Sequence, residues 1–474
     1  MQPSQTDPGP SRGEGGAAPP GQPTLRKNYL SGFENIAQTL GTMAPTGTLG
    51  VVIPLVIGKT GNGSWLLILA VLGICLLILF NINVFATRCA SAGGLGTYAR
   101  LGLGPRAGAA TTWIYIGAML FGAASSAPSA AYYACLVLSQ CAGLPNTAAL
   151  EASVTALVVA AAWWTAYRDM KLSSDVMIVI EVASLAVMIA IIALALSKTG
   201  LWIDAPQATL EGAGPKAFSA GLVLAFLTMG GFESATTLGE EAKQAEKTIP
   251  RAIMQCVLPL GVLYLAMTYF LVALGRRYGI ALEQLEAPFD TIARASHFAL
   301  LGTASSVGVA MSYFACTLGS INAGSRAMYS LSEGRLFFRS VGYAHPRNGT
   351  PHRAIAIIGV IAIAAPAGLL LSGVSLVSCI DYLSQLAALG FIGSYFLVCL
   401  AAPFFLAGLG CLHWQGVAVS ASALLLLAGV LVQSVYPVPE KPACYLPYVF
   451  LSLMAAGMCL SWRLSRPAEA PIAA

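Results

Sequence analysis

Long apolar segments separated by short polar connections fill almost the whole chain. Eight runs contain no Asp, Glu, Lys or Arg, and each exceeds the ~20 residues that a helix needs to cross a bilayer. Other apolar segments carry only isolated ionisable residues. The pattern predicts an all-α integral membrane protein, because helices pair their own backbone groups in lipid. About twelve spans are expected, at 33–57, 63–88, 107–141, 147–167, 172–197, 217–239, 252–275, 293–331, 354–375, 379–406, 414–435 and 445–463.

Composition and charge agree with this class. Hydrophobic residues make up 57% of the chain and charged residues 9%, against about 25% charged in a soluble domain. With a cytoplasmic N-terminus, 18 of the 25 basic residues fall on the cytoplasmic side. The positive-inside rule therefore places both termini in the cytoplasm of a multi-pass cell-membrane protein. The same asymmetry accounts for the net charge of +5 and gives no reason to expect nucleic acid as a partner.

The segments outside the spans are short. Residues 1–28, mostly rich in Pro, Gly and Ser, are expected to form a disordered cytoplasmic tail without a cleavable signal peptide, and 466–474 a second tail. The eleven cysteines are scattered and form no C-x-x-C pair. We therefore expect no disulfide framework, no metal site and no cofactor.

Two of the expected spans are interrupted by helix breakers. The first contains "GTMAPTGTLG" (41–50), where Pro45 removes a backbone donor and Gly47 lowers helix propensity. The sixth contains "TMGGFESATTLGEE" (228–241), with Gly230 and Gly231 beside Glu233. Close helix packing explains a single such glycine pair. Non-helical backbone at membrane depth is otherwise tolerated only inside protein or along a cavity.

The two interruptions occupy matching positions in the chain. They lie in the first spans of two five-span units, 33–197 and 217–406, and two extra helices follow in 407–465. Interrupted segments at corresponding positions in two halves are the sequence mark of an inverted-repeat transporter. An odd number of spans gives the second unit the opposite orientation. The two broken helices are therefore expected to run antiparallel within a transporter core covering 29–406.

Broken helix ends predict the chemistry of the ligand. Free N–H groups at a half-helix N-terminus suit a carboxylate, and free carbonyls at a half-helix C-terminus suit an ammonium group. Together they suit a zwitterion, so free α-amino acids are the expected substrates. The predicted substrate-binding residues are Ala44, Pro45, Thr46, Gly47, Thr48, Phe226, Thr228, Met229, Gly230 and Gly231.

Several segments resemble one known family. "GFESATTLGEEAKQAEKTIPRAI" (231–253) resembles the helix 6 signature of the amino acid–polyamine–organocation superfamily, in its amino acid permease branch. "INAGSRAMYSLSEGRLF" (321–337) is similar to the end of helix 8 there, and 382–406 to helix 10. In helix 1, Pro45-Thr46-Gly47 replaces the Gly-Ser-Gly turn of many relatives. The resemblance implies the five-plus-five leucine-transporter fold with helices 1 and 6 broken, and secondary transport of amino acids or related amines.

The candidate residues for ion coupling are polar groups within spans. Glu233 and Glu181 are acids inside spans and therefore functional candidates. For Glu233 a functional role is favoured over a structural hydrogen bond. For Glu181 a structural salt bridge or hydrogen bond between helices is favoured over an ion-linked role. Some proton-coupled relatives place a lysine in helix 5, where Ser184 stands here. Proton coupling through Glu233 or Glu181 is expected first, because a buried carboxylate with a raised pKa can carry a proton without further machinery. Exchange of one amino acid for another without an ion is the second expectation. Sodium, with Ser184, Thr317 and Ser320 near the vacated position, is the remaining option.

Other classes of protein were weighed against a permease. An exchanger of amino acids or polyamines without ion coupling fits the same pattern. A non-transporting amino acid sensor would be expected to carry a cytoplasmic signalling domain, for which the short loops leave no room. An enzyme is not expected, because the four histidines form no H-x-x-x-H cluster and no Walker motif is present.

Overall fold

The computed structural model describes residues 24–280, 287–436, 438 and 441–465, and within these ranges the protein is helical. The described part contains no β-strand, only one isolated bridge between Leu30 and Ala242. Most of the expected tail 1–28, and all of 466–474, lies outside the described residues. The last residues of the tail are ordered, contrary to expectation: Leu25 is buried and Arg26 pairs with Asp169.

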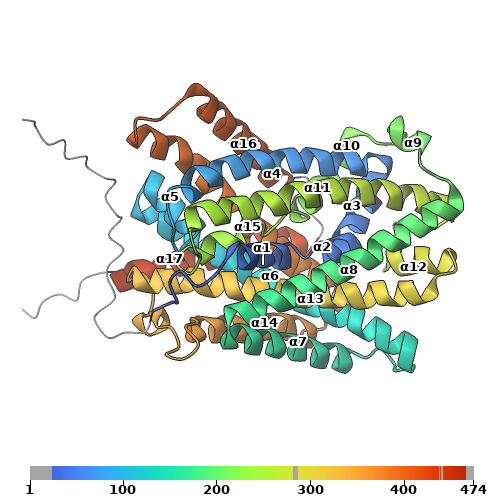
Figure 1. The fold of residues 1–474 in the computed structure, drawn as a ribbon, viewed down its shortest axis with the longest axis horizontal. Helices are drawn as coiled ribbons and strands as arrows, with labels where there is room; N and C mark the ends of the chain where they lie inside the picture. The colour runs from blue at the N-terminus through green and yellow to red at the C-terminus, as the bar shows by residue number, and fades with distance from the viewer. Residues whose placement is uncertain (1–23, 281–286, 437, 439–440, 466–474) are drawn as a thin grey trace, which may run out of the picture.

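The helices run lengthwise beside one another (Figure 1). The first half of the chain contains α1 (Gly32–Met43), α2 (Pro45–Gly47), the π-helical turn η1 (Thr48–Val52), α3 (Ile53–Thr60), η2 (Gly61–Gly63), α4 (Ser64–Ala86), α5 (Leu95–Leu103), α6 (Pro105–Ala142), α7 (Ala148–Arg168), α8 (Met170–Thr199) and α9 (Ala205–Ala208). The second half contains α10 (Pro215–Leu227), η3 (Ser234–Leu238), α11 (Ala245–Arg277), α12 (Pro288–Ala295), α13 (Ala299–Glu333), η5 (Arg339–Gly342), α14 (His352–Leu371), α15 (Leu376–Gly408), α16 (Trp414–Gln433), η6 (Ala443–Tyr445) and α17 (Leu446–Ser465).

Ten helical stretches of the described chain are long and apolar enough to cross a membrane. The difference from the twelve expected spans lies in the two interrupted segments. Gly32–Ala86 is counted as one stretch although it holds two expected spans, and the span expected at 217–239 contains only the 13-residue α10. The span expected from 293 begins at Ala299, because His297 has a φ of 64° that ends α12.

The centre of the bundle is formed by α6, along which both α13 and α15 pack. Small residues allow these contacts: a Cβ on Gly390 of α15 would lie 2.8 Å from the backbone of Ala118 in α6. Outward-facing side chains are apolar and exposed, among them Leu300, Leu371 and Leu425. A large exposed apolar surface of this kind fits contact with lipid.

A buried ion pair anchors the segment that follows η3. Arg326 of α13 holds both carboxylate oxygens of Glu241, and neither side chain is more than 3% exposed. The Glu241 carbonyl also accepts the N–H groups of Tyr29 and Leu30, at 2.7 and 2.9 Å. Glu241 therefore joins α13, the segment after η3 and the residues just before α1.

We expect this ion pair to dominate the stability of that end of the bundle. Arg326→Met or Glu241→Gln alone leaves a buried group without its partner, at a cost of about 3–5 kcal/mol. Each single variant should lower the unfolding temperature of the detergent-purified protein, and the double variant should recover part of the loss. The control is Arg26→Met, at a partly exposed pair worth about 1 kcal/mol or less. A double variant whose loss of unfolding temperature equals the sum of the two single losses would show that Arg326 and Glu241 do not stabilise the protein as a pair.

Candidate functional site

The first expected interruption is present and lies at Ala44. Helix α1 ends at Met43, and Ala44 adopts a left-handed φ of 44°, which is uncommon for a residue other than glycine. Pro45 then begins α2 at a position where no N–H group is needed. Thr46 and Gly47 complete this short turn, which continues through Thr48 into η1 and α3.

The second interruption follows α10. That helix ends at Leu227, and residues 228–233 form turns before the 3₁₀ segment η3. Gly231 has a φ of +86°, so a side chain there would be strained. Its Cβ would also lie 2.6 Å from Thr42 Cγ2 of α1, which shows how closely the two interruptions approach.

Three contacts show that the broken segments pass each other in opposite directions. A Cβ on Gly221 would lie 2.5 Å from Thr60 Cγ2, and Gly231 lies against Thr42. Further along, Ser234 Oγ donates to the Gln38 carbonyl at 3.3 Å. As residue numbers rise in one segment they fall in the other, so α10 lies beside α3 and η3 beside α1. The two interruptions are adjacent, as the antiparallel arrangement requires.

Glu181 of α8 lies at the N-terminus of α2. Its Oε2 accepts the Thr46 N–H at 3.4 Å and the Thr46 hydroxyl at 3.2 Å. Its Oε1 accepts the Ser312 hydroxyl of α13 at 2.6 Å, and the side chain is fully buried. A coupling candidate and a predicted substrate-binding residue are therefore in direct contact. Negative or acceptor groups are favourable at this end of a helix.

The remaining backbone groups of the first interruption also have protein partners. Gly47 N–H donates to Ser312 Oγ at 3.0 Å, and Gly47 carbonyl accepts the Tyr313 hydroxyl at 3.2 Å. Thr48 N–H donates to the Ala44 carbonyl at 2.8 Å, and Thr48 Oγ1 to the Met43 carbonyl at 3.1 Å. The first interruption is thus capped by the protein itself.

The second interruption is capped incompletely. The N–H groups of Thr228, Met229 and Gly230 donate to the carbonyls of 225, 226 and 227, and Thr228 Oγ1 donates to Ala225. From the described residues, no donor of normal hydrogen-bond geometry reaches the carbonyl oxygens of Thr228, Met229 or Gly230. Thr228 and Met229 are buried. A carbonyl oxygen has two lone pairs, so these carbonyls can accept a hydrogen bond from a further donor.

Glu233 lies just beyond these carbonyls and is bonded to α15. Its Oε2 accepts the hydroxyl of Tyr395, and both residues are fully buried. Its Oε1 makes no hydrogen bond of normal geometry with the described residues. The hydroxyl of Tyr115 from α6 is near the same carboxyl group, again without a bond of normal geometry. The Tyr115 hydroxyl is therefore the protein donor available to this carboxyl group, beside which a ligand donor could also bind.

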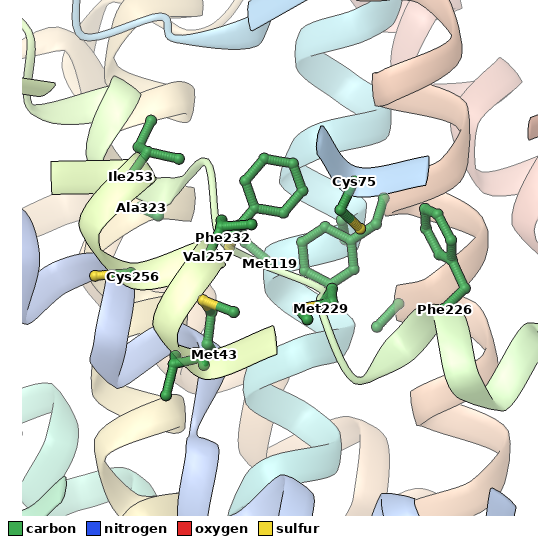
Figure 2. Packing of buried hydrophobic residues seen from close by; sticks show 14 of the residues in the cluster. Met43, Cys75, Met119, Phe226, Met229, Phe232, Ile253, Cys256, Val257 and Ala323 are labelled. Atoms are coloured by element: carbon green, nitrogen blue, oxygen red, sulfur yellow. The ribbon is translucent and has the colours of Figure 1, made fainter. Parts of the chain in front are cut away.

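Aromatic and apolar side chains surround Glu233. The Tyr395 ring lies 5.2 Å from Phe232 and 6.1 Å from both Phe226 and Phe391, between ring centroids. Figure 2 shows Phe226 at the end of α10, then Met229 and Phe232 on the chain that follows, with Cys75 of α4 close by. The second interruption thus combines free acceptors with aromatic faces.

Of the three hydroxyl candidates for a sodium site, Ser184 lies apart from the other two. Ser184 packs against Gly308 of α13, where a Cβ would lie 3.0 Å away. Thr317 instead bonds Ser126 of α6 at 2.8 Å, and Ser320 lies against Gly122 of α6. Positions 308 and 317 are about 13 Å apart along a helix. No cluster of three His, Cys, Asp or Glu side chains suited to a metal occurs in the part of the chain described.

Sequence reasoning missed the partners of both acids. Ser312 and Tyr313 lie on the same expected span as Thr317, but nothing in an apolar segment distinguished them. Tyr395 lies in the segment similar to helix 10, where a tyrosine among apolar residues was the available signal. Tyr115 and Phe391 carried no signal of their own.

The fold and site define a helical membrane protein with two adjacent, oppositely directed helix interruptions and a buried acid at each. Residues 35–457 match the amino acid permease family model, and the chain belongs to this family. This is a family of transporters, and the relatives below are named as permeases, importers or transporters and not as enzymes.

Curated relatives agree with a transport role. The chain is 33% identical to the low-affinity putrescine importer PlaP of Escherichia coli (strain K12) over 140 residues, 28% of this chain and 30% of that protein. It is 29% identical to the branched-chain amino acid permease BcaP of Lactococcus lactis subsp. cremoris over 143 residues, 30% of each chain. Over 354 residues, 73% of this chain and 75% of the relative, it is 25% identical to uncharacterized transporter Rv1999c of Mycobacterium tuberculosis. The match thus spans under a third of the two relatives whose names state a solute.

Substituting Gly231 tests the contact between the interruptions. In Gly231→Leu, strain of about 1–3 kcal/mol adds to a clash with Thr42. We expect loss of transport by reconstituted protein, and the same for Gly230→Leu, whose Cβ would lie 3.1 Å from Phe391. The matched control is Gly73→Leu, where a Cβ meets nothing within 4 Å. Normal transport by either variant would remove that glycine from the site.

Proposed function

We propose that the protein is a secondary active transporter that moves small amine-bearing solutes across the cell membrane by alternating access around the two interruptions. The observation that carries the proposal is the adjacent, antiparallel pair of interruptions with Glu181 and Glu233 buried beside them. Antiparallel discontinuous helices of an inverted repeat form the substrate sites of such transporters near the bilayer midplane.

The names of the relatives suggest which chemical class of solute is transported. One relative is named for putrescine and the other for branched-chain amino acids. These solutes share an amino group, which is cationic at neutral pH. The free carbonyls of residues 228–230 and the negative end of α10 suit such a group. Recognition of an ammonium group at the second interruption is therefore the common step that we propose for this chain.

We further propose that transport is coupled to protons through Glu233. A carboxyl group can take up a proton without any additional ligand, whereas a sodium site needs several oxygen ligands. The separation of Ser184 from Thr317 and Ser320 leaves the expected hydroxyl set incomplete. Protonation of Glu233 would change its bond to Tyr395, and so links the proton to contact between the second interruption and α15. Exchange without an ion is the second candidate, since the site itself needs no ion to hold an amine.

Uptake into liposomes under imposed gradients tests this function. With no solute inside, an inward proton gradient should drive accumulation, and a protonophore should abolish it. Glu233→Gln should keep solute binding but lose the dependence of uptake on pH, because the side chain can no longer take up a proton. The control Glu211→Gln, at an exposed carboxylate, should behave as wild type.

Other outcomes of the same experiment are distinct. Accumulation that follows sodium and ignores pH would reject proton coupling. Uptake that appears only with solute inside the liposomes would establish exchange. No movement of any amine or amino acid under any gradient would reject the transport function.

A further inference from the structure

We propose that Glu181 takes the place of a substrate's carboxylate at the first interruption, so that this chain is selective for organic amines that lack an α-carboxylate. This inference rests on the transport function proposed above and names its substrate class. It departs from the zwitterion expected from the two helix ends.

At the first interruption, the hydrogen-bond donors that a carboxylate would need are already used. A substrate carboxylate would bind the free N–H groups at the start of α2. Pro45 has none, Thr46 N–H and its hydroxyl are held by Glu181, and Gly47 N–H is held by Ser312 Oγ. The next N–H group, that of Thr48, is bonded to the Ala44 carbonyl. Every donor of this turn is occupied within the protein.

A substrate carboxylate that displaced Glu181 from the Thr46 N–H would bind at a cost in free energy. Its Oε1 also accepts the Ser312 hydroxyl, so Glu181 and Ser312 satisfy each other and both backbone donors. A substrate carboxylate that took over Thr46 would leave the fully buried Glu181 carboxyl group short of donors. An unpaired buried polar group is unfavourable, and two acidic groups at one helix end would repel.

At the second interruption, by contrast, the protein offers hydrogen-bond acceptors. The carbonyl oxygens of Thr228, Met229 and Gly230 and the Oε1 atom of Glu233 lack donors of normal geometry among the described residues. An ammonium group offers up to three donors and no acceptor, which matches such a set. The rings of Phe226, Phe232 and Tyr395 add faces of the kind that attract cations.

The two interruptions therefore have unequal roles. The first supplies its own carboxyl group and offers nothing to an anion. The second offers acceptors to a cation. A ligand with an amino group and an apolar or second amino end satisfies this pattern, whereas the α-carboxylate of an amino acid finds no free donor in the first interruption.

Matched pairs of ligands that differ only in the carboxylate give the test. The pairs are putrescine with ornithine, cadaverine with lysine, and isopentylamine with leucine. Binding is measured on the purified full-length protein by the ligand-dependent rise in its unfolding temperature, and transport separately in liposomes. We expect each amine to act at a concentration at least about tenfold below that of its amino acid, or about 1.4 kcal/mol.

The outcomes separate the inference from the transport function. Amino acids that bind as tightly as their amines, or more tightly, would overturn the inference, as would the failure of every amine to bind. Amines that bind selectively but never cross the membrane would support the inference and reject the transport function. Selective binding with transport supports both.

A variant at Glu181 tests the assigned cause. Glu181→Ala frees the Thr46 N–H, so the preference for amine over amino acid should shift at least about tenfold toward the amino acid, or about 1.4 kcal/mol. Glu181→Gln retains a side-chain oxygen that accepts a hydrogen bond, and should keep the preference closer to wild type. A merely structural glutamate would weaken both ligand classes equally in Glu181→Ala, and that result would overturn the proposal.

Discussion

A helix that breaks inside a membrane must find partners for the backbone groups that the break frees, because hydrocarbon supplies none. The two broken segments of this protein meet this constraint in different ways. Around Ala44, side chains from α8 and α13 satisfy every freed donor. After Leu227, the carbonyls of residues 228–230 are left for a partner outside the described protein. The proposed position of the ligand site and its proposed preference for a cation both rest on this difference.

The capping of the first interruption also joins parts of the bundle. Glu181 and Ser312 bring α8 and α13 onto the same two backbone groups of residues 46 and 47. The second interruption is joined to α15 through the bond between Glu233 and Tyr395. In the proposed transport cycle, the first interruption would therefore move together with α8 and α13 or separate from them. The second interruption would move together with α15 or separate from it. Protonation of Glu233 would act on the second of these connections.

The sequence predicted the helical membrane class and the places of both interruptions, because Pro45 and the pair Gly230-Gly231 act through local backbone geometry. It did not predict which groups meet there. Thr46 and Glu181 are 135 positions apart, and Glu233 and Tyr395 are 162 apart, so only tertiary packing joins them. The sequence likewise did not reveal that Ser184 lies against Gly308, away from Thr317 and Ser320, because a polar residue in an apolar span does not show which neighbour it faces. The expectation of a carboxylate site rested on free N–H groups at a helix end, and the sequence did not reveal that Glu181 bonds the N–H of Thr46.

The central claim is that the first interruption is closed by Glu181 while the second receives the ligand's cation. A cryo-electron microscopy map of the protein in a lipid nanodisc with a bound amine, at a resolution that shows side chains, tests it most directly. The account predicts ligand density against the carbonyls of residues 228–230, with Glu181 still bonded to Thr46 and Ser312. Ligand density at the Thr46 N–H with Glu181 displaced, or density remote from both interruptions, would contradict it.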